Sequence, residues 1–166
     1  MTDTVIQWES YADSARNAGI RVVNTRNGIV LSATGGALGR MLMPWKLGGG
    51  GPLAGGKQWM SWISLDDEIY AIHHLMMNNQ CEGAYNLTAP NPSRQKTFSK
   101  TLGKVLRRPA IAPIPGFTMR ILFGELAKPL LIEGQRVLPK RLKESGYEFT
   151  HNTLEEALRD SLGKWR

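Results

Sequence analysis

The sequence predicts a mixed α/β protein that is rich in helix, and two observations lead to this class. Apolar residues recur at helical spacing over most of the chain. Only two short runs, around Arg21–Val23 and Tyr85–Thr88, have the continuous apolar character of strands buried in a parallel sheet. The 166 residues are enough for one domain, or slightly more, with a real hydrophobic core.

The composition narrows the classes of function. Hydrophobic residues make up 42% of the chain and charged residues 21%, which is typical of a globular protein and excludes a disordered one. The net charge of +7 allows an anionic partner, but the basic residues are scattered and no recognition motif accompanies them. We therefore expect no nucleic-acid partner.

The sequence also indicates a location. Cys81 is the single cysteine, so no intrachain disulfide is expected, and this fits a reducing cytoplasm. The first residues do not resemble a signal peptide, and no apolar run approaches the ~18 residues of a membrane span. We expect a cytoplasmic protein without a membrane partner.

The first predicted element is a helix from Thr4, which has capping-box spacing with Gln7, to a C-terminal cap at Gly19. The run "IRVVNTRNGIVLS" that follows is typical of a strand. Asn27-Gly28 in its middle indicates a hairpin turn. The alternative is a strand that opens into a loop at the mouth of a site.

The central part of the chain alternates helices with short strands. A short helix over Gly36–Met43 ends or kinks at Pro44, and a glycine-rich loop follows. "KQWMSWI" alternates as a strand does, which places one of its tryptophans in the core and the other beside a pocket. Ser64 and Asp67 then cap a helix with Ile69, Ile72 and Met76 on one side.

The second half is mainly helical. "GAYNLTA" is a strand, and a helix from Ser93 directs Phe98, Leu102, Val105 and Leu106 inward. We expect a short apolar helix over Phe117–Phe123 and another that starts at Pro139 and closes at Gly146. Thr153 and Glu156 form a capping box for a last helix that runs through Leu162.

Two glycine motifs resemble phosphate-binding loops and fail their contextual tests. "GPLAGGKQ" over Gly51–Gln58 has Gln where a P-loop has Ser or Thr, and it lies between a loop and a strand. "TGGALG" lacks the first glycine of a dinucleotide fingerprint and the later acidic residue. The glycine-rich loop is more simply a flexible segment that borders a ligand.

Other candidate chemistry is sparse. His73 and His74 are adjacent on a helix and point in different directions, so they cannot share a metal ion. Asp66-Asp67 are most simply acids at a helix N-terminus, with a catalytic pair as the alternative. His151 stands far from these residues near a turn. We assign no catalytic residue and no metal site from these patterns.

Several segments together resemble one family. "RVVNTRNGIVLSATGGALGRMLMPWKLGGGGPLAGGKQWMSWISLDD" is similar to the nucleoside-diphosphate-sugar epimerase family of atypical short-chain dehydrogenases/reductases. "GAYNLTAPNP", "FSKTLGKVLRRPA", "GELA", "EGQRVLPKRL" and "TLEEALRD" resemble the C-terminal region of the same family, in the same order. The likeness covers nearly the whole chain and makes it similar to a C-terminal part of such an enzyme.

This resemblance implies a fold and a domain division. It implies an α-rich C-terminal portion of an extended Rossmann-type short-chain dehydrogenase, with few strands and a mostly helical substrate domain. Residues 1–35 and 82–91 would belong to the NAD(P)-binding domain. Residues 36–81 and 92–166 would form the C-terminal substrate-binding region.

The resemblance also implies what to expect of activity. In the family a glycine-rich turn binds the cofactor, and a Tyr-x-x-x-Lys pair precedes a helix like "VIQWESYADSA". Those two positions fall near Met1 and Val5 here, so the pair is absent. We expect a C-terminal fragment of a NAD(P)-dependent sugar-nucleotide epimerase or oxidoreductase that is inactive alone and binds no cofactor by itself. The alternative is a non-catalytic basic interaction module.

Site residues follow from the resemblance by position. In the intact enzyme, NAD(P) would contact Asn27, Gly28, Ile29 and Val30. A nucleotide-sugar-like small molecule would contact Lys57, Gln58, Trp62 and Arg136, with Lys57 suited to the diphosphate. Because the predicted buried strands need partners on both sides, we also expect self-association through an exposed sheet edge.

Overall fold

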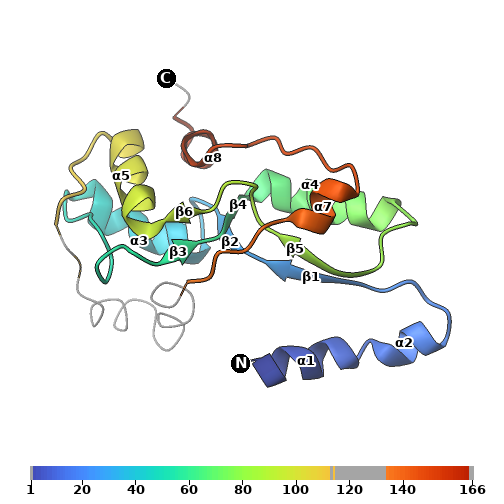
Figure 1. Ribbon diagram of the computed structural model, residues 1–166. Coiled ribbons are helices and arrows are strands. Elements are labelled where there is room, and N and C mark those ends of the chain that lie inside the picture. The colour runs from blue at the N-terminus through green and yellow to red at the C-terminus, as the bar shows by residue number, and fades with distance from the viewer. Residues whose placement is uncertain (1, 113, 115–133, 165–166) are drawn as a thin grey trace.

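The computed structural model describes residues 2–112, 114 and 134–164. The predicted α-rich α/β fold is confirmed (Figure 1). The N-terminal half holds α1 Thr2–Ser10, α2 Asp13–Asn17, β1 Val23–Asn27, β2 Ile29–Leu31, α3 Gly36–Lys46, β3 Trp59–Met60, β4 Trp62–Ser64 and α4 Leu65–Met77. It is followed by β5 Gly83–Leu87, β6 Ser93–Arg94, α5 Gln95–Leu106, α7 Lys140–Glu144 and α8 Leu154–Ser161.

The strands form three pairs. β1 pairs with β5 in parallel and β2 pairs with β4 in parallel, whereas β3 and β6 are antiparallel. The predicted hairpin at Asn27-Gly28 is wrong, because β1 and β2 do not pair with each other. The chain instead runs on through Gly28 and changes partner from β5 to β4.

Two apolar clusters form the core. The larger lies between β2, β4, α3, α5 and α8 and includes Trp45, Trp62 and Phe98. The smaller packs α4 and α7 against β5 through Ile63, Leu75 and further buried residues. Phe98, Leu102 and Val105 face inward as predicted, and α5 therefore packs against α8.

The helix ends follow their sequence signals in several places. The Ser64 side chain accepts a hydrogen bond from Asp67 N at 3.1 Å, which caps α4 as predicted. Thr153 and Glu156 form the predicted capping box of α8, and Pro139 precedes α7. The predicted helix over Phe117–Phe123 lies outside the described residues.

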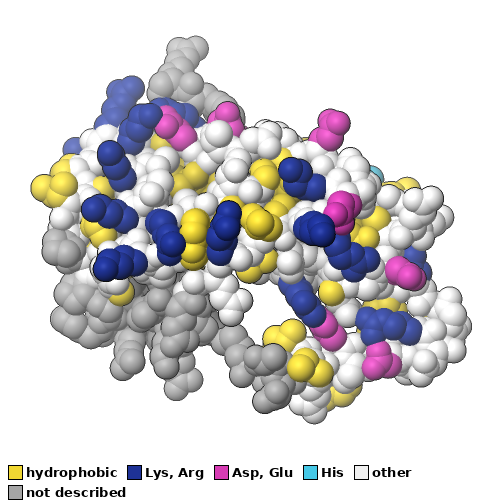
Figure 2. Space-filling view, in the orientation of Figure 1, with side chains coloured by type: hydrophobic (Ala, Val, Ile, Leu, Met, Phe, Trp, Pro, Cys, Tyr) yellow, Lys and Arg dark blue, Asp and Glu magenta, His cyan; other side chains and the backbone are white. Residues whose placement is uncertain are grey.

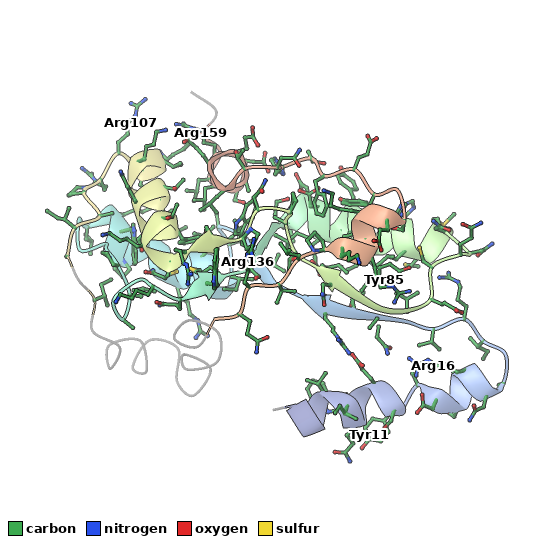
Figure 3. The ribbon with its side chains drawn as sticks, in the orientation of Figure 1. Tyr11, Arg16, Tyr85, Arg107, Arg136 and Arg159 are labelled. Carbon is green, nitrogen blue, oxygen red and sulfur yellow. The ribbon has the colours of Figure 1, made fainter. Side chains whose placement is uncertain are left out.

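The N-terminal helix differs from its prediction. It breaks at Tyr11–Ala12 into α1 and α2, which extend below β1 as a separate arm (Figures 1 and 3). Gly19 ends α2 with a positive φ of 76°, as expected of a C-terminal cap. Among the described residues, no helix combines the length and the apolar character needed to cross a bilayer.

Candidate cofactor and substrate site

Gly28 marks the point where the strands change partner. Its N–H donates to Leu87 O at 2.8 Å, and the next N–H, that of Ile29, donates to Ser61 O at 2.8 Å. A Cβ on Gly28 would lie 2.7 Å from Ser61 O and 2.9 Å from Thr88 Cγ2. Only glycine fits this close approach, so this junction needs a residue without a side chain.

Ser61 joins the two groups of predicted site residues. Its carbonyl oxygen holds Ile29, on the predicted cofactor side. Its hydroxyl donates to Gln135 O at 2.8 Å and accepts from Val137 N at 2.9 Å, which places Arg136 beside it. One serine, which no sequence pattern singled out, therefore links residues 27–30, 57–62 and 136.

The predicted cofactor residues are not equally available to a ligand. Asn27 is exposed at the carboxyl end of β1, opposite Leu87 at the end of β5. Ligands of parallel α/β sheets bind at such carboxyl ends. The N–H groups of Gly28 and Ile29 are used within the fold, and Val30 packs against the smaller apolar cluster. Asn27 is thus the member of this group best placed to meet a cofactor.

An aromatic and basic platform lies on β3 and β6, next to Ser61. The guanidinium carbon of Arg94 lies 3.9 Å from the centroid of the Trp59 ring, and that of Arg136 lies 5.2 Å from it. The Arg94 guanidinium also donates to Lys57 O. Neither arginine has a carboxylate partner among the described residues. A guanidinium group stacked on an aromatic ring can still present further N–H donors at its edge to a phosphate.

This platform lies on a basic face of the molecule. Figure 2 shows Lys and Arg side chains gathered over the part of the surface that carries α5, β3 and β6. Arg136, labelled in Figure 3, lies beside these strands, whereas Arg107 and Arg159 lie apart near α5 and α8. Figure 2 also shows further Lys and Arg side chains over the rest of this face, so the basic surface extends beyond the platform.

The other predicted substrate residues differ in accessibility. The Lys57 side chain is exposed, but Gln58 Nε2 donates to Leu53 O at 3.0 Å within the loop. Trp62 is fully buried, and its indole N–H donates to Asn91 O at 3.1 Å. The sequence placed one tryptophan in the core and one at a pocket. Trp62 is the core residue, and Trp59 is the half-buried one.

The glycine-rich loop is packed against α5. Gly50, Gly51 and Gly56 are buried, and a Cβ on Gly56 would lie 2.8 Å from Lys96 Cβ. Leu53 N donates to Gln95 Oε1, and Ser99 Oγ donates to Gly51 O. The expectation of a flexible loop is not supported by this packing, since the buried glycines allow close contact with the helix.

A buried carboxylate holds the C-terminal segment on α4. Asp67 is fully buried and accepts hydrogen bonds from Ser64 Oγ, Tyr147 OH, Thr150 N and His151 N at 2.7–3.0 Å. Burial and the Asp67 charge raise the pKa of Tyr147 well above its usual range, so its hydroxyl stays a donor. The sequence identified Asp67 only as a helix-capping acid, because its partners lie far along the chain.

Glu68, the next residue, has the opposite environment. It is 6% exposed, and neither carboxylate oxygen has a hydrogen-bond partner among the described residues. Burial raises the pKa of Glu68 from 4.5 to about 7. This carboxyl group therefore changes its charge near neutral pH.

Comparisons with known proteins find one family model and several relatives that are similar to this chain. The family model described as "Domain of unknown function (DUF1731)" matches residues 114–161. An epimerase family protein of Staphylococcus aureus (strain MRSA252) is 39% identical over 164 residues, which cover 99% of this chain and 54% of the relative. A Staphylococcus epidermidis epimerase family protein is also 39% identical and is covered to 54%. The chain spans about half the length of the curated relatives it matches.

Solved structures show the same likeness. The human epimerase family protein SDR39U1 (isoform 2), solved with NADPH, has a TM-score of 0.81 and 36% identity. The alignment covers 87% of this chain and 49% of the human chain. A nucleoside-diphosphate sugar epimerase from Corynebacterium glutamicum has a TM-score of 0.71 and 27% identity, over 94% of this chain and 29% of that one.

Proposed function

We propose that this chain, which is similar to a C-terminal part of epimerase family proteins, forms the substrate-facing part of a NAD(P)-dependent enzyme acting on a nucleotide sugar. Under this proposal, residues 36–81 and 92–166 bind the substrate, and residues 1–35 and 82–91 belong to the cofactor domain. NAD(P) would supply the hydride transfer, and this chain would orient the two reactants.

The observation that carries this proposal is the junction at Ser61. Ser61 holds Ile29, two residues after Asn27 at the carboxyl end of β1, and it also holds Gln135 and Val137 on either side of Arg136, a member of the Trp59 platform. A site for hydride transfer requires a nicotinamide and a substrate side by side. We assign Asn27 to the cofactor side and Lys57, Arg94 and Arg136 to the phosphates of the substrate.

The platform suits a nucleoside diphosphate for two reasons. Arg94 and Arg136 present planar donors that match phosphate oxygens, and Trp59 holds both guanidinium groups in position. The exposed Lys57 side chain adds a further positive charge. Gln58 and Trp62, which the family resemblance also places at the substrate, would support this surface from beneath rather than contact the ligand.

The experiment is a calorimetric titration of the chain with UDP as probe. Arg136→Gln and Arg94→Gln should each weaken UDP binding about tenfold or more, because each removes a charged hydrogen bond. Arg108→Gln is the matched control, since Arg108 is exposed and outside the platform. Equal affinity for all variants would overturn the assignment.

A titration with NADPH tests the other half of the proposal. We expect no tight binding by this chain alone, because the glycine-rich cofactor turn of the family is not found in its sequence. Stoichiometric binding of NADPH to this chain would contradict that expectation. Binding of nucleic acid with a steep salt dependence would instead favour the alternative of a basic interaction module.

A further inference from the structure

Three metal-ligating side chains lie together away from the Trp59 platform. Asp66 comes from the first turn of α4, His151 from the segment before α8, and Asp160 from the last turn of α8. One ligand atom of each lies within 4.8 Å of those of the other two. His151 is 4% exposed, and both aspartates are half-buried. The fold brings these residues together although the sequence separates them widely.

The hydrogen bonds behind His151 determine which ring nitrogen carries hydrogen. The Ser64 hydroxyl donates to Asp67 Oδ2 at 2.8 Å, so its oxygen must accept at the 3.0 Å contact with His151 Nδ1. Nδ1 is therefore the N–H donor. In the neutral ring the lone pair lies on Nε2, which faces Asp160. This orientation of a histidine by its other ring nitrogen is usual at metal sites.

The distance from Nε2 to the Asp160 carboxylate fits a shared ion. Nε2 lies 3.8 Å from Oδ2 of Asp160, which is too long for a direct hydrogen bond. Two ligands that bind one ion at about 2.1 Å each are separated by roughly 3–4 Å. His151 and Asp160 already meet this condition, and Asp66 needs only a small side-chain movement to join them.

We propose that Asp66, His151 Nε2 and Asp160 bind one divalent transition-metal ion of the Zn²⁺ class. Two carboxylates and one neutral imidazole supply two negative charges, which balance the ion, and nitrogen and oxygen donors of this kind suit zinc. Ser64 and Asp67 form the supporting shell. The ion would link the start of α4 to α8 and so hold the C-terminal helix in place.

The test uses the full chain, stripped of metal with a chelator, and then titrated with Zn²⁺ by calorimetry and with Co²⁺ by visible absorption. We expect one ion per chain and a rise in the midpoint of thermal unfolding on binding. Asp160→Asn should weaken binding at least tenfold and change the Co²⁺ spectrum. Asp66→Asn should do the same, since both side chains are half-buried and their loss spares the core.

Two control variants distinguish this site from nonspecific metal binding at the surface. His73→Gln removes an exposed histidine on α4, and Glu148→Gln removes an exposed acid close in sequence to His151; neither should alter affinity. His151→Gln should abolish binding, and Asp160→Asn keeps the test decisive if that buried substitution prevents folding. No measurable binding, or binding that survives Asp160→Asn but is lost in His73→Gln, would overturn the proposal.

Discussion

The C-terminal segment and the N-terminal arm are attached to the rest of the fold in contrasting ways. The C-terminal segment is held by the buried carboxylate of Asp67 and by apolar residues such as Leu142 and Leu158, both fully buried. Among the described residues, the arm of α1 and α2 makes one ion pair with the strands, in which Arg26 donates to both carboxylate oxygens of Glu9 at 2.7 and 2.8 Å. Its large apolar side chains are exposed, with Trp8 at 69%.

This contrast shows which apolar surfaces of the molecule are covered by other residues and which are exposed to solvent. Exposed apolar residues also lie on α4, where Ile69, Ile72 and Met76 are 53%, 37% and 65% exposed. Clustered apolar residues on a protein surface are typical of an interaction site. In the C-terminal segment, by comparison, no buried side-chain polar atom of residues 134–164 lacks a hydrogen-bond partner. The following predictions test this difference, beginning with the largest expected effect.

Asp67→Asn should be the most damaging change. Asparagine offers one acceptor oxygen in place of two, so its NH₂ group must face either Thr150 N, which donates to Oδ1, or His151 N, which donates to Oδ2. We expect a loss of about 3–5 kcal/mol in the free energy of unfolding, measured by urea denaturation in the presence of a chelator. Asp66→Asn is the matched control and should lose less than about 1 kcal/mol. Equal stability of the two variants would contradict the role of Asp67 as an anchor.

Glu68→Gln should raise the free energy of unfolding, and only at higher pH. The folded state holds the proton of Glu68 up to a pKa of about 7, whereas the unfolded state releases it near 4.5. Stability of the parent protein therefore falls as pH rises between these values, by about 2–3 kcal/mol in all. The variant should lack this fall and be the more stable protein at pH 8, with little difference at pH 4.5. Parallel stability curves for the two proteins would refute the explanation.

These two neighbouring acids show how far the sequence could predict the fold. Local signals gave the caps of α4 and α8 and the α5 core face correctly, because each depends on residues close in sequence. The strand expected around Arg21–Val23 lies later, as β1 Val23–Asn27, and β2 and β4 form a second parallel pair that was not predicted. Asp67 is hydrogen-bonded and Glu68 is not, because Tyr147, Thr150 and His151 donate to Asp67 alone. No local sequence pattern connects these three residues to α4. The partner change at Gly28 was missed for the same reason.

The candidate site shows the same division. The residues predicted from the family resemblance do come together, but periodicity could not say which tryptophan was buried. Trp59 and Arg94 entered the site only because β3 pairs with β6, a contact made by four residues in all. No sequence pattern indicated that Ile69, Ile72 and Met76 of α4 would be exposed. When a helix has apolar residues on two faces, only the structure shows which of the two faces is buried.

Met76→Lys should weaken self-association of the chain. Met76 and Ile72 line a groove of about 250 Å³ with Arg21, Val23 and Thr25, on the open side of β1. We propose that a second copy covers this face, so a buried lysine should lower the association constant at least tenfold by its desolvation. Sedimentation velocity over a range of concentrations measures this effect. Leu47→Lys, at an exposed position beyond α3, should leave association unchanged. A monomeric parent chain at all concentrations would contradict the proposal.

Glu9→Gln should have the smallest effect on global stability and a local effect on the arm. The hydrogen bond from Arg26 holds the pKa of Glu9 below its usual value of 4.5. The ion pair is therefore fully formed at pH values above 4.5, and it is lost as the pH falls through the lowered pKa. An exposed pair contributes little to global unfolding and is weakened by salt. Amide exchange in α1 should therefore speed up in Glu9→Gln, in high salt and at low pH alike, while the unfolding midpoint stays constant. Asp13→Asn breaks only the contact with Arg16 inside α2 and should leave exchange in α1 unchanged. If exchange in α1 were equally slow in Glu9→Gln and the parent, the arm would be held by its apolar contacts and not by this ion pair.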